Sequence, residues 1–328
     1  CRNETAMSDP IRQTRILTQI DPRTWEHPAD RAALNALRKI PVFDQVLRGV
    51  FGFFGEKPLR LAFLASSVRV SPTQFPRVHR LYLEAARTLD VEPYPLYVQK
   101  GYTLNAFAFG MQKPFIVLNS LTVEELDDNE LRFVLGHELG HVLSGHTLYL
   151  TMMVVLYQLS LVGFPIVGLA ARAVLMALME WHRKAELSCD RAGILAVQDP
   201  EAAMRTMLKF AGGHADQTNL ADFIAQAEEY RETGDLADQV FKVLNVLALT
   251  HPAPVIRVAE MRNWFESGAY ERILAGEYRR RGEPEPGYAE DIAAAAASYR
   301  ESARDAFGNA QQAARRVVDS FRQGFGAR

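Results

Sequence analysis

Two histidines and a glutamate form the most informative pattern in the chain. They stand as H-E-x-x-H at His137, Glu138 and His141, inside an apolar run that predicts a helix. Residues four apart lie on one face of a helix, so His137 and His141 can bind one metal ion together. Glu138 lies beside them and can act as a general base toward a water on that metal. The spacing predicts a zinc peptidase site; two surface histidines on an ordinary helix are the alternative.

A catalytic zinc needs three protein ligands and an open fourth position. We expect the third ligand to come from a second helix, and Glu186 is the strongest candidate. Asp190 follows one turn later and can accept a hydrogen bond from the far nitrogen of a ligand histidine, which would orient that ring. The alternative for Glu186 and Asp190 is a solvated, charged helix face. The sequence thus predicts one zinc per chain, held by His137, His141 and Glu186.

Two further histidines lie near these segments. His146 follows His137 by nine residues, which places it on the wrong face for the same ion. His182 precedes Glu186 by one helical turn and could flank the site. For both, the more frequent role is that of a plain surface histidine.

Composition restricts the classes of function. The 328 residues carry a formal net charge of -2, so there is no electrostatic case for a nucleic-acid partner. Two cysteines exclude a disulfide framework and favour a reducing compartment such as the cytoplasm. The polar first ten residues argue against a signal peptide. Cys1 could be the lipidated residue of a mature lipoprotein, but we favour a foreign remnant before Met7.

Apolar periodicity predicts an α+β fold that is mainly helical, with a small sheet. We expect loops at 49–55 and 212–235, and a capping box formed by Thr122 and Glu125. Helices are predicted over 30–48, 76–90, 121–126, 129–143, 180–197, 201–210, 238–249 and 255–265, and strands over 96–98, 103–109 and 114–119.

Composition also divides the chain into four parts. Residues 1–30 predict an irregular N-terminal arm, and 31–281 the metal-binding domain. Residues 282–288 contain two prolines and predict a linker, and the Ala-rich stretch 289–328 predicts a helical tail.

The segment 148–179 is unusually apolar, because Arg172 is its only charged residue. Gly163 and Pro165 break it into halves of about sixteen residues, shorter than the roughly twenty that cross a bilayer upright. We therefore expect an apolar helical hairpin. Its faces would be covered by the core, by a second subunit or by a membrane surface, which allows peripheral membrane association.

Taken together, these motifs resemble the zinc metallopeptidases of the HtpX and CAAX-prenyl-protease type, a branch of the gluzincins. The resemblance covers about residues 75–265, and the motifs follow the family's order. The matching pieces are 105–108, 115–120, 134–146, Glu186 with Asp190, and His251-Pro252 with Arg257.

The resemblance implies roles for residues outside the H-E-x-x-H helix. The edge strand that contains Asn105, Ala106 and Phe107 would hold an extended substrate by β-augmentation. His251 would stabilise the oxyanion, while Arg257 would anchor that segment or touch the same charge.

We therefore expect a zinc-dependent endopeptidase that acts on polypeptides, with a role in protein quality control. Members of the HtpX type carry flanking transmembrane helices, and no N-terminal span is visible here. Two alternatives are a metal-stabilised, non-catalytic adaptor and a membrane-associated assembly factor. An intact Glu138 argues against the adaptor, since a structural metal site would not need it.

Overall fold

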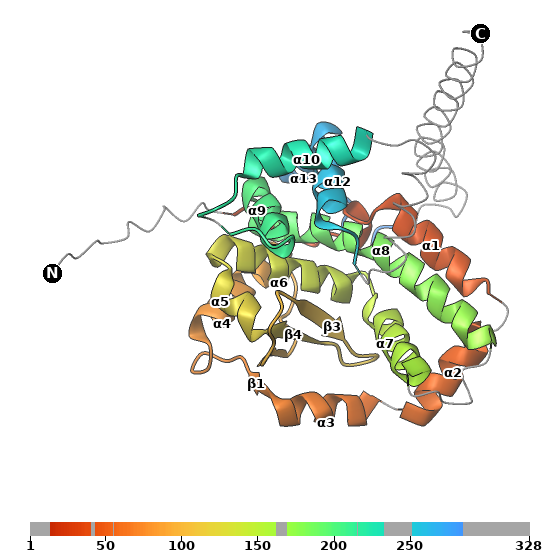
Figure 1. Ribbon diagram of the computed structural model, residues 1–328. Coiled ribbons are helices and arrows are strands. Elements are labelled where there is room, and N and C mark those ends of the chain that lie inside the picture. Colours follow the sequence, from red (N-terminus) through yellow and green to blue (C-terminus); the bar gives the residue numbers. More distant parts are fainter. Residues whose placement is uncertain are drawn as a thin grey trace, which may run out of the picture.

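The computed structural model describes residues 14–40, 43–54, 56–161, 169–214, 216–232 and 251–284. These residues are mainly helical, with one small sheet (Figure 1). The helices are η1 (Pro22–Thr24), α1 (Pro28–Arg38), α2 (Phe43–Phe54), α3 (Glu56–Ser66), α4 (Pro76–Thr88), α5 (Ser120–Glu125), α6 (Asp128–Leu143), α7 (Thr147–Leu161), α8 (Leu169–Val197), α9 (Pro200–Phe210), α10 (Leu220–Glu232), α12 (Pro254–Glu266) and α13 (Ala269–Ala275). The strands are β1 (Ser67–Arg69), β2 (Leu96–Gln99), β3 (Ala106–Phe109) and β4 (Phe115–Asn119).

The four strands form a mixed sheet in the order β1-β2-β4-β3. β2 and β4 run parallel, and the outer strands β1 and β3 pair with them antiparallel. In the register of β3 and β4, Ala106 lies opposite Leu118 and Phe109 opposite Phe115. Among the described residues, β3 has no strand on its other side, so it is an edge strand, as the family resemblance implies.

The sheet lies between α6 and α3 (Figure 1). Its α6 side belongs to the main hydrophobic core, with side chains from α4, α6 and the end of α8. On the other side, Phe63 of α3 packs against Phe107, Phe109 and Phe115. A further cluster joins α1, α2, α7 and the first half of α8.

Helix α6 is buried almost along its whole length, from Glu130 to Val142. Such a helix needs no polar face, which explains why its sequence shows little amphipathicity. It begins with a capping box between Asp127 and Glu130. Two glycines let it approach α8 closely: a Cβ on Gly136 would lie 2.3 Å from Ala196 Cβ, and one on Gly140 2.7 Å from Ala192 Cβ.

The apolar segment 148–179 lies in two helices, α7 and α8, which both contribute to the cluster with α1 and α2. The second helix does not stop at residue 180, where the charged stretch begins. It continues to Val197 as one helix of 29 residues. The expected turn near Gly163 and Pro165 lies outside the described residues.

Three local predictions were wrong. Residues 49–54 belong to α2 rather than to a loop, so the helix accommodates both of the glycines in this stretch. The predicted loop 212–235 contains α10. Thr122 caps nothing: its hydroxyl, inside α5, accepts from the amide of Asn105 and donates to that residue's carbonyl.

Over residues 14–27 the expected N-terminal arm is irregular apart from η1. This stretch nevertheless packs on the core. Leu17, Ile20 and Trp25 are buried in the main cluster, and Ile20 forms a bridge to Arg280. The predicted helix 238–249 and the predicted tail 289–328 lie outside the described residues.

The structure also bears on membrane crossing. Within the described ranges, no single helix is both long enough and apolar enough to span a membrane. Residues Asp128–Leu143 and Thr147–Ser160 reach that length and apolarity only as a pair that is bent by 94°.

The close contact of α6 with α8 leads to a test of packing. Gly136→Ala should destabilise the metal-free protein by about 1–3 kcal/mol, because the new methyl group overlaps Ala196. Denaturant unfolding of chelator-treated protein measures this loss. Gly49→Ala is the matched control: it lies in α2 with nothing within 4 Å of the added carbon, and should stabilise slightly. Equal stability of the Gly136 variant and the native protein would contradict the account.

Candidate metal centre and active site

The contact between α6 and α8 brings the three predicted ligands together. His137 and His141 point from one face of α6, and Glu186 meets them from α8. The two histidine Nε2 atoms are 3.2 Å apart. Glu186 Oε1 lies 3.1 Å from His141 Nε2, and its Oε2 lies 3.5 Å from His137 Nε2. The three residues selected by their spacing in the sequence therefore form one cluster of possible metal ligands.

These separations fit a zinc ion. Zinc bonds to nitrogen are about 2.0–2.1 Å long, so ligand atoms at the corners of a tetrahedron lie roughly 3.3 Å apart. All three side chains are at least nine-tenths buried. Within the described part of the chain, Glu186 Oε2 has no hydrogen-bond partner, although it is completely buried. A bound cation would satisfy this atom, so the residues present suit a zinc ion.

Asp190 and Arg257 support the first ligand. His137 Nδ1 lies 3.1 Å from Asp190 Oδ1 and donates to it. Arg257, from α12, donates from Nε to Asp190 Oδ2 at 2.8 Å and from Nη2 to Oδ1. Its Nη1 also lies 3.6 Å from Glu186 Oε2. The arginine therefore balances the charge of Asp190, lies close to that of Glu186, and ties α12 to α8.

The interpretation of His146 and His182 as surface histidines was wrong. His146 is 1% exposed, and its Nδ1 lies 3.2 Å from His141 Nδ1. His182 is 5% exposed, and its Nδ1 lies 3.5 Å from Glu186 Oε1. His146 reaches the site because the chain turns sharply at Gly145, where φ is +69°.

His251 lies at the mouth of this cluster. Its ring centroid is 5.2 Å from that of His182, and its Nε2 is 3.9 Å from Glu186 Oε2. The side chain is 41% exposed, so it can meet a ligand entering from solvent.

Glu138 is 4% exposed, and its Oε2 has no hydrogen-bond partner within the described residues. It lines a cavity of about 300 Å³ together with His137 and Glu186. The remaining lining residues are Thr103, Leu104, Asn105, Ala106, Phe133, Val134, Phe210, His251, Pro252, Ala253, Pro254 and Arg257. The predicted base and two of the predicted ligands thus line one cavity. Ala106, the first residue of β3, lines the same cavity.

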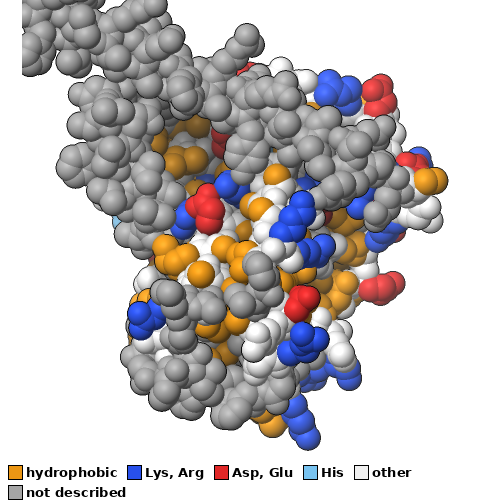
Figure 2. Space-filling view, turned by 90° about the vertical axis from the view of Figure 1, so that its right-hand side faces the viewer, with side chains coloured by type: hydrophobic (Ala, Val, Ile, Leu, Met, Phe, Trp, Pro, Cys, Tyr) orange, Lys and Arg blue, Asp and Glu red, His pale blue; other side chains and the backbone are white. Residues whose placement is uncertain are grey.

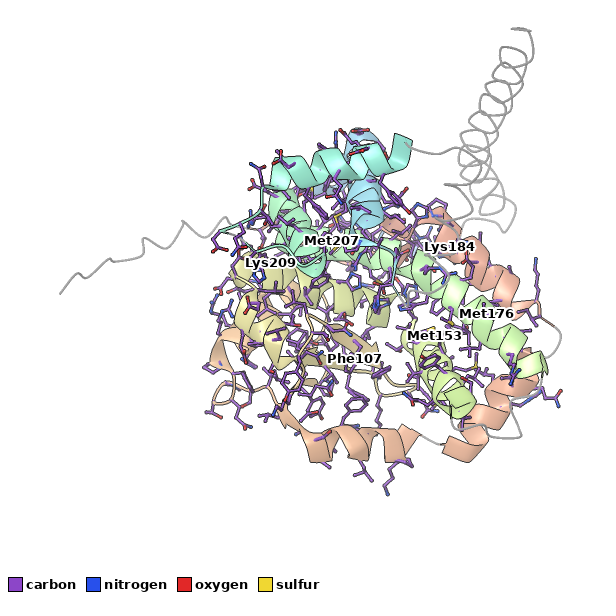
Figure 3. The ribbon with its side chains drawn as sticks, viewed as in Figure 1. Phe107, Met153, Met176, Lys184, Met207 and Lys209 are labelled. Carbon is purple, nitrogen blue, oxygen red and sulfur yellow. The ribbon has the colours of Figure 1, made fainter. Side chains whose placement is uncertain are left out.

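The predicted substrate-binding residues do not all face that cavity. Asn105 and Ala106 line it. The Phe107 side chain instead packs against Phe63 on the opposite side of the sheet, with the two ring centroids 6.0 Å apart (Figure 3). Asn119 N donates to Asn105 O, so Asn105 turns its backbone toward β4. Backbone groups alternate along a strand, and Ala106 and Ala108 therefore turn theirs to the free edge.

Burial and neighbouring charges set the protonation of the metal-free site. Burial lowers the pKa of His141 to about 4 and that of His182 to about 3, so both rings are neutral. Burial opposes the charge on His137 too, but Glu186 and Asp190 outweigh it and raise its pKa to about 9. Burial raises the pKa of Glu138 to about 8, so this carboxyl is largely protonated in the metal-free site at neutral pH.

Sequence reasoning missed one participant, Asp30 of α1. It is 1% exposed and lies 3.2 Å from His146 Nε2. The Gly-His pair after the H-E-x-x-H motif was a visible signal for His146. No sequence motif around Asp30 points to this role, because its contact with His146 joins residues more than a hundred positions apart.

This chain is similar in sequence to known peptidases. The sequence model of peptidase family M48 matches residues 72–265, more than half of the chain. The plastoglobule-localized metallopeptidase 48 of Arabidopsis thaliana chloroplasts is 34% identical over 266 residues, which is 79% of this chain and 77% of that protein. A protease HtpX homolog of Helicobacter pylori is 39% identical over 69 residues, 20% of this chain and 22% of that protein.

The raised pKa of His137 leads to a prediction about pH. A metal ion must displace the proton that this ring holds up to about pH 9. We therefore expect the affinity of the metal-free protein for zinc to rise as pH increases from 6.5 toward 9, with proton release. The proton also stabilises the metal-free fold below pH 6.5, and this contribution is lost as pH rises through about 9.

Isothermal titration calorimetry in buffers of different ionisation enthalpy counts the protons released on zinc binding. Affinity that does not change over this range, without proton release, would contradict the assigned charge state of His137.

Proposed function

This chain belongs to peptidase family M48, and from this premise we propose that it is a zinc-dependent endopeptidase of the gluzincin type. The single observation that carries the proposal is the convergence of His137, His141 and Glu186 on one point beside the buried carboxyl of Glu138. One zinc per chain, held by these three ligands, would polarise the scissile carbonyl and acidify a water molecule in the open position.

The chain's own residues supply the remaining chemistry. Glu138 takes the proton of the attacking water and later passes it to the leaving amine. His251 stabilises the negative charge that develops on the carbonyl oxygen, since it is exposed at the cavity and lies within 3.9 Å of Glu186. Arg257 has an anchoring role, because two of its nitrogens are bound to Asp190.

The substrate is a polypeptide segment that pairs with β3 as an added strand. The groups available for pairing are the backbone N–H and C=O of Ala106 and Ala108. In the free protein, the N–H of Ala106 donates to its neighbour Asn105 Oδ1 at 2.9 Å. The Asn105 side chain thus occupies a donor that an incoming strand would use. Strand pairing recognises backbone, so it suits unfolded proteins of varied sequence, as quality control requires.

Removing the proposed base separates chemistry from metal binding. Glu138→Gln should retain zinc but lose peptidase activity by about 10²- to 10⁴-fold, because only proton transfer is removed. Casein digestion and metal analysis of the same preparation measure the two properties. Glu124→Gln, an exposed carboxylate on α5, is the matched control and should behave like the native protein.

Two other results would be informative. Full activity of Glu138→Gln would remove Glu138 from the mechanism. A native protein that binds zinc and unfolded polypeptide, but never cleaves it, would favour the adaptor alternative.

The apolar segment supports peripheral attachment to a lipid surface. Helix α7 carries no charged residue. Tyr157 on α7 is 44% exposed, and Met176 on α8 is 53% exposed. Figure 2 shows the side of the molecule on which α1, α2 and α8 lie, where hydrophobic side chains reach the surface among basic and other side chains. A relative named for its plastoglobule location is consistent with this proposal.

Charge placed on this surface should release the protein from lipid. We expect the native protein to float with neutral phosphatidylcholine vesicles, and the double variant Tyr157→Lys, Met176→Lys to remain unbound while keeping its peptidase activity. Leu83→Lys is the matched control, because Leu83 on α4 is 41% exposed. Equal flotation of the double variant and the native protein would exclude this surface as the attachment site.

A further inference from the structure

The second ligand histidine is backed by two buried side chains. His141 Nδ1 lies 3.2 Å from His146 Nδ1, and His146 Nε2 lies 3.2 Å from Asp30 Oδ2. All three residues are at most 2% exposed. We propose that Asp30 and His146, here called the Asp30–His146 pair, are positioning residues that fix the tautomer and orientation of His141. The inference rests on the proposed zinc site.

The hydrogen-bond directions follow from the chemistry of imidazole. A nitrogen that binds a metal carries no proton, so the proton of neutral His141 resides on Nδ1. His146 Nδ1 must then accept it, which leaves the His146 proton on Nε2. That proton points at the Asp30 carboxylate, which can only accept. One arrangement of protons therefore satisfies the ring nitrogens and the carboxylate that link His141 through His146 to Asp30.

Asp30 is itself held on both oxygens. Trp181 Nε1 donates to Oδ1 at 2.8 Å, and Ser188 Oγ donates to Oδ2 at 2.6 Å. Ser188 also accepts from the backbone amide of His27 at 2.8 Å. Because Trp181 and Ser188 both belong to α8, these bonds fix the start of α1 against the helix that supplies Glu186. Asp30 cannot be displaced without breaking this docking.

The turn that follows α6 places His146 next to His141. Gly145 adopts a left-handed conformation, and the His146 amide donates to the carbonyl of His141 at 2.9 Å. The ring is thereby turned back onto the helix that carries the ligands. The Cys189 thiol lies 3.6 Å from the same His146 nitrogen, but sulfur is a weak partner and does not replace the imidazole contact.

The two ligand histidines therefore have separate carboxylate supports. His137 donates directly to Asp190, whereas His141 reaches Asp30 through a second histidine. The direct support lies within residues 72–265, which the family model matches, and Asp30 lies outside them. The structure thus makes the metal site depend on α1, an element that the family match does not include.

The test measures zinc affinity by competition with a chromophoric chelator. We expect His146→Leu to weaken zinc binding about 10- to 100-fold, because His141 loses its acceptor. His146→Asn should restore affinity to within about threefold, since its amide oxygen can accept the same hydrogen bond. Asp30→Asn, which keeps an acceptor but removes the charge, should weaken binding by roughly three- to tenfold.

A second readout and a control separate positioning from general stability. The visible spectrum of the cobalt-substituted protein should change in His146→Leu and be restored in His146→Asn. Thr206→Val is the control, because it removes a buried hydrogen bond to the Ala202 carbonyl in α9. It should lower the melting temperature of the metal-free protein without changing zinc affinity.

The outcomes are distinct. Native affinity in both His146→Leu and Asp30→Asn would overturn the inference while leaving the zinc site intact. Equal loss in His146→Leu and His146→Asn would mean that ring packing matters instead of the hydrogen bond. If His146→Leu does not fold, Asp30→Asn and His146→Asn decide the question. A native protein that binds no zinc at all would instead refute the proposed function.

Discussion

The close approach of α6 to α8 is the constraint on which the rest of the structure depends. Gly136 and Gly140 leave room for Ala196 and Ala192, so at these two positions the helices approach with alanine methyl groups between them. Only at this separation can Glu186 on one helix reach the histidine nitrogens on the other. The sheet, α4 and α9 then cover the remaining faces of α6, which is why a helix with histidines and acidic residues is buried nearly throughout.

Burying so many ionisable groups creates a problem of charge that the surrounding elements largely resolve. An isolated buried carboxylate is costly, and Asp30, Asp190 and Glu186 each have a hydrogen-bond donor or cation within hydrogen-bond distance. Arg257 from α12 pairs with Asp190, while Trp181, Ser188 and His146 surround Asp30. Glu186 remains incompletely satisfied, with one oxygen unpartnered among the described residues. That imbalance is what a divalent cation would correct, so stability and metal binding are physically linked.

The sequence predicted those features that depend on local spacing. The H-E-x-x-H helix, the strands at 96–98 and 114–119, and the placement of Glu186 and Asp190 one turn apart on a second helix follow from spacing within one or two turns. Contacts between distant segments were not predictable in this way. Asp30 has no local mark, and the burial of His146 depends on the turn at Gly145 and on α1. Helix α8 continues through the expected boundary because tertiary packing outweighs the change from apolar to charged residues.

The central claim is that one metal ion joins α6 to α8. A crystal structure with anomalous diffraction measured at the zinc absorption edge tests it most directly. The account predicts one strong peak per chain, about 2.0–2.2 Å from His137 Nε2, His141 Nε2 and an oxygen of Glu186. Among the described residues, two other clusters offer donors close enough together: His141 with His146 and Cys189, and His182 with Glu186 and His251. A peak held by either of these clusters, or no peak in zinc-loaded crystals, would contradict the account.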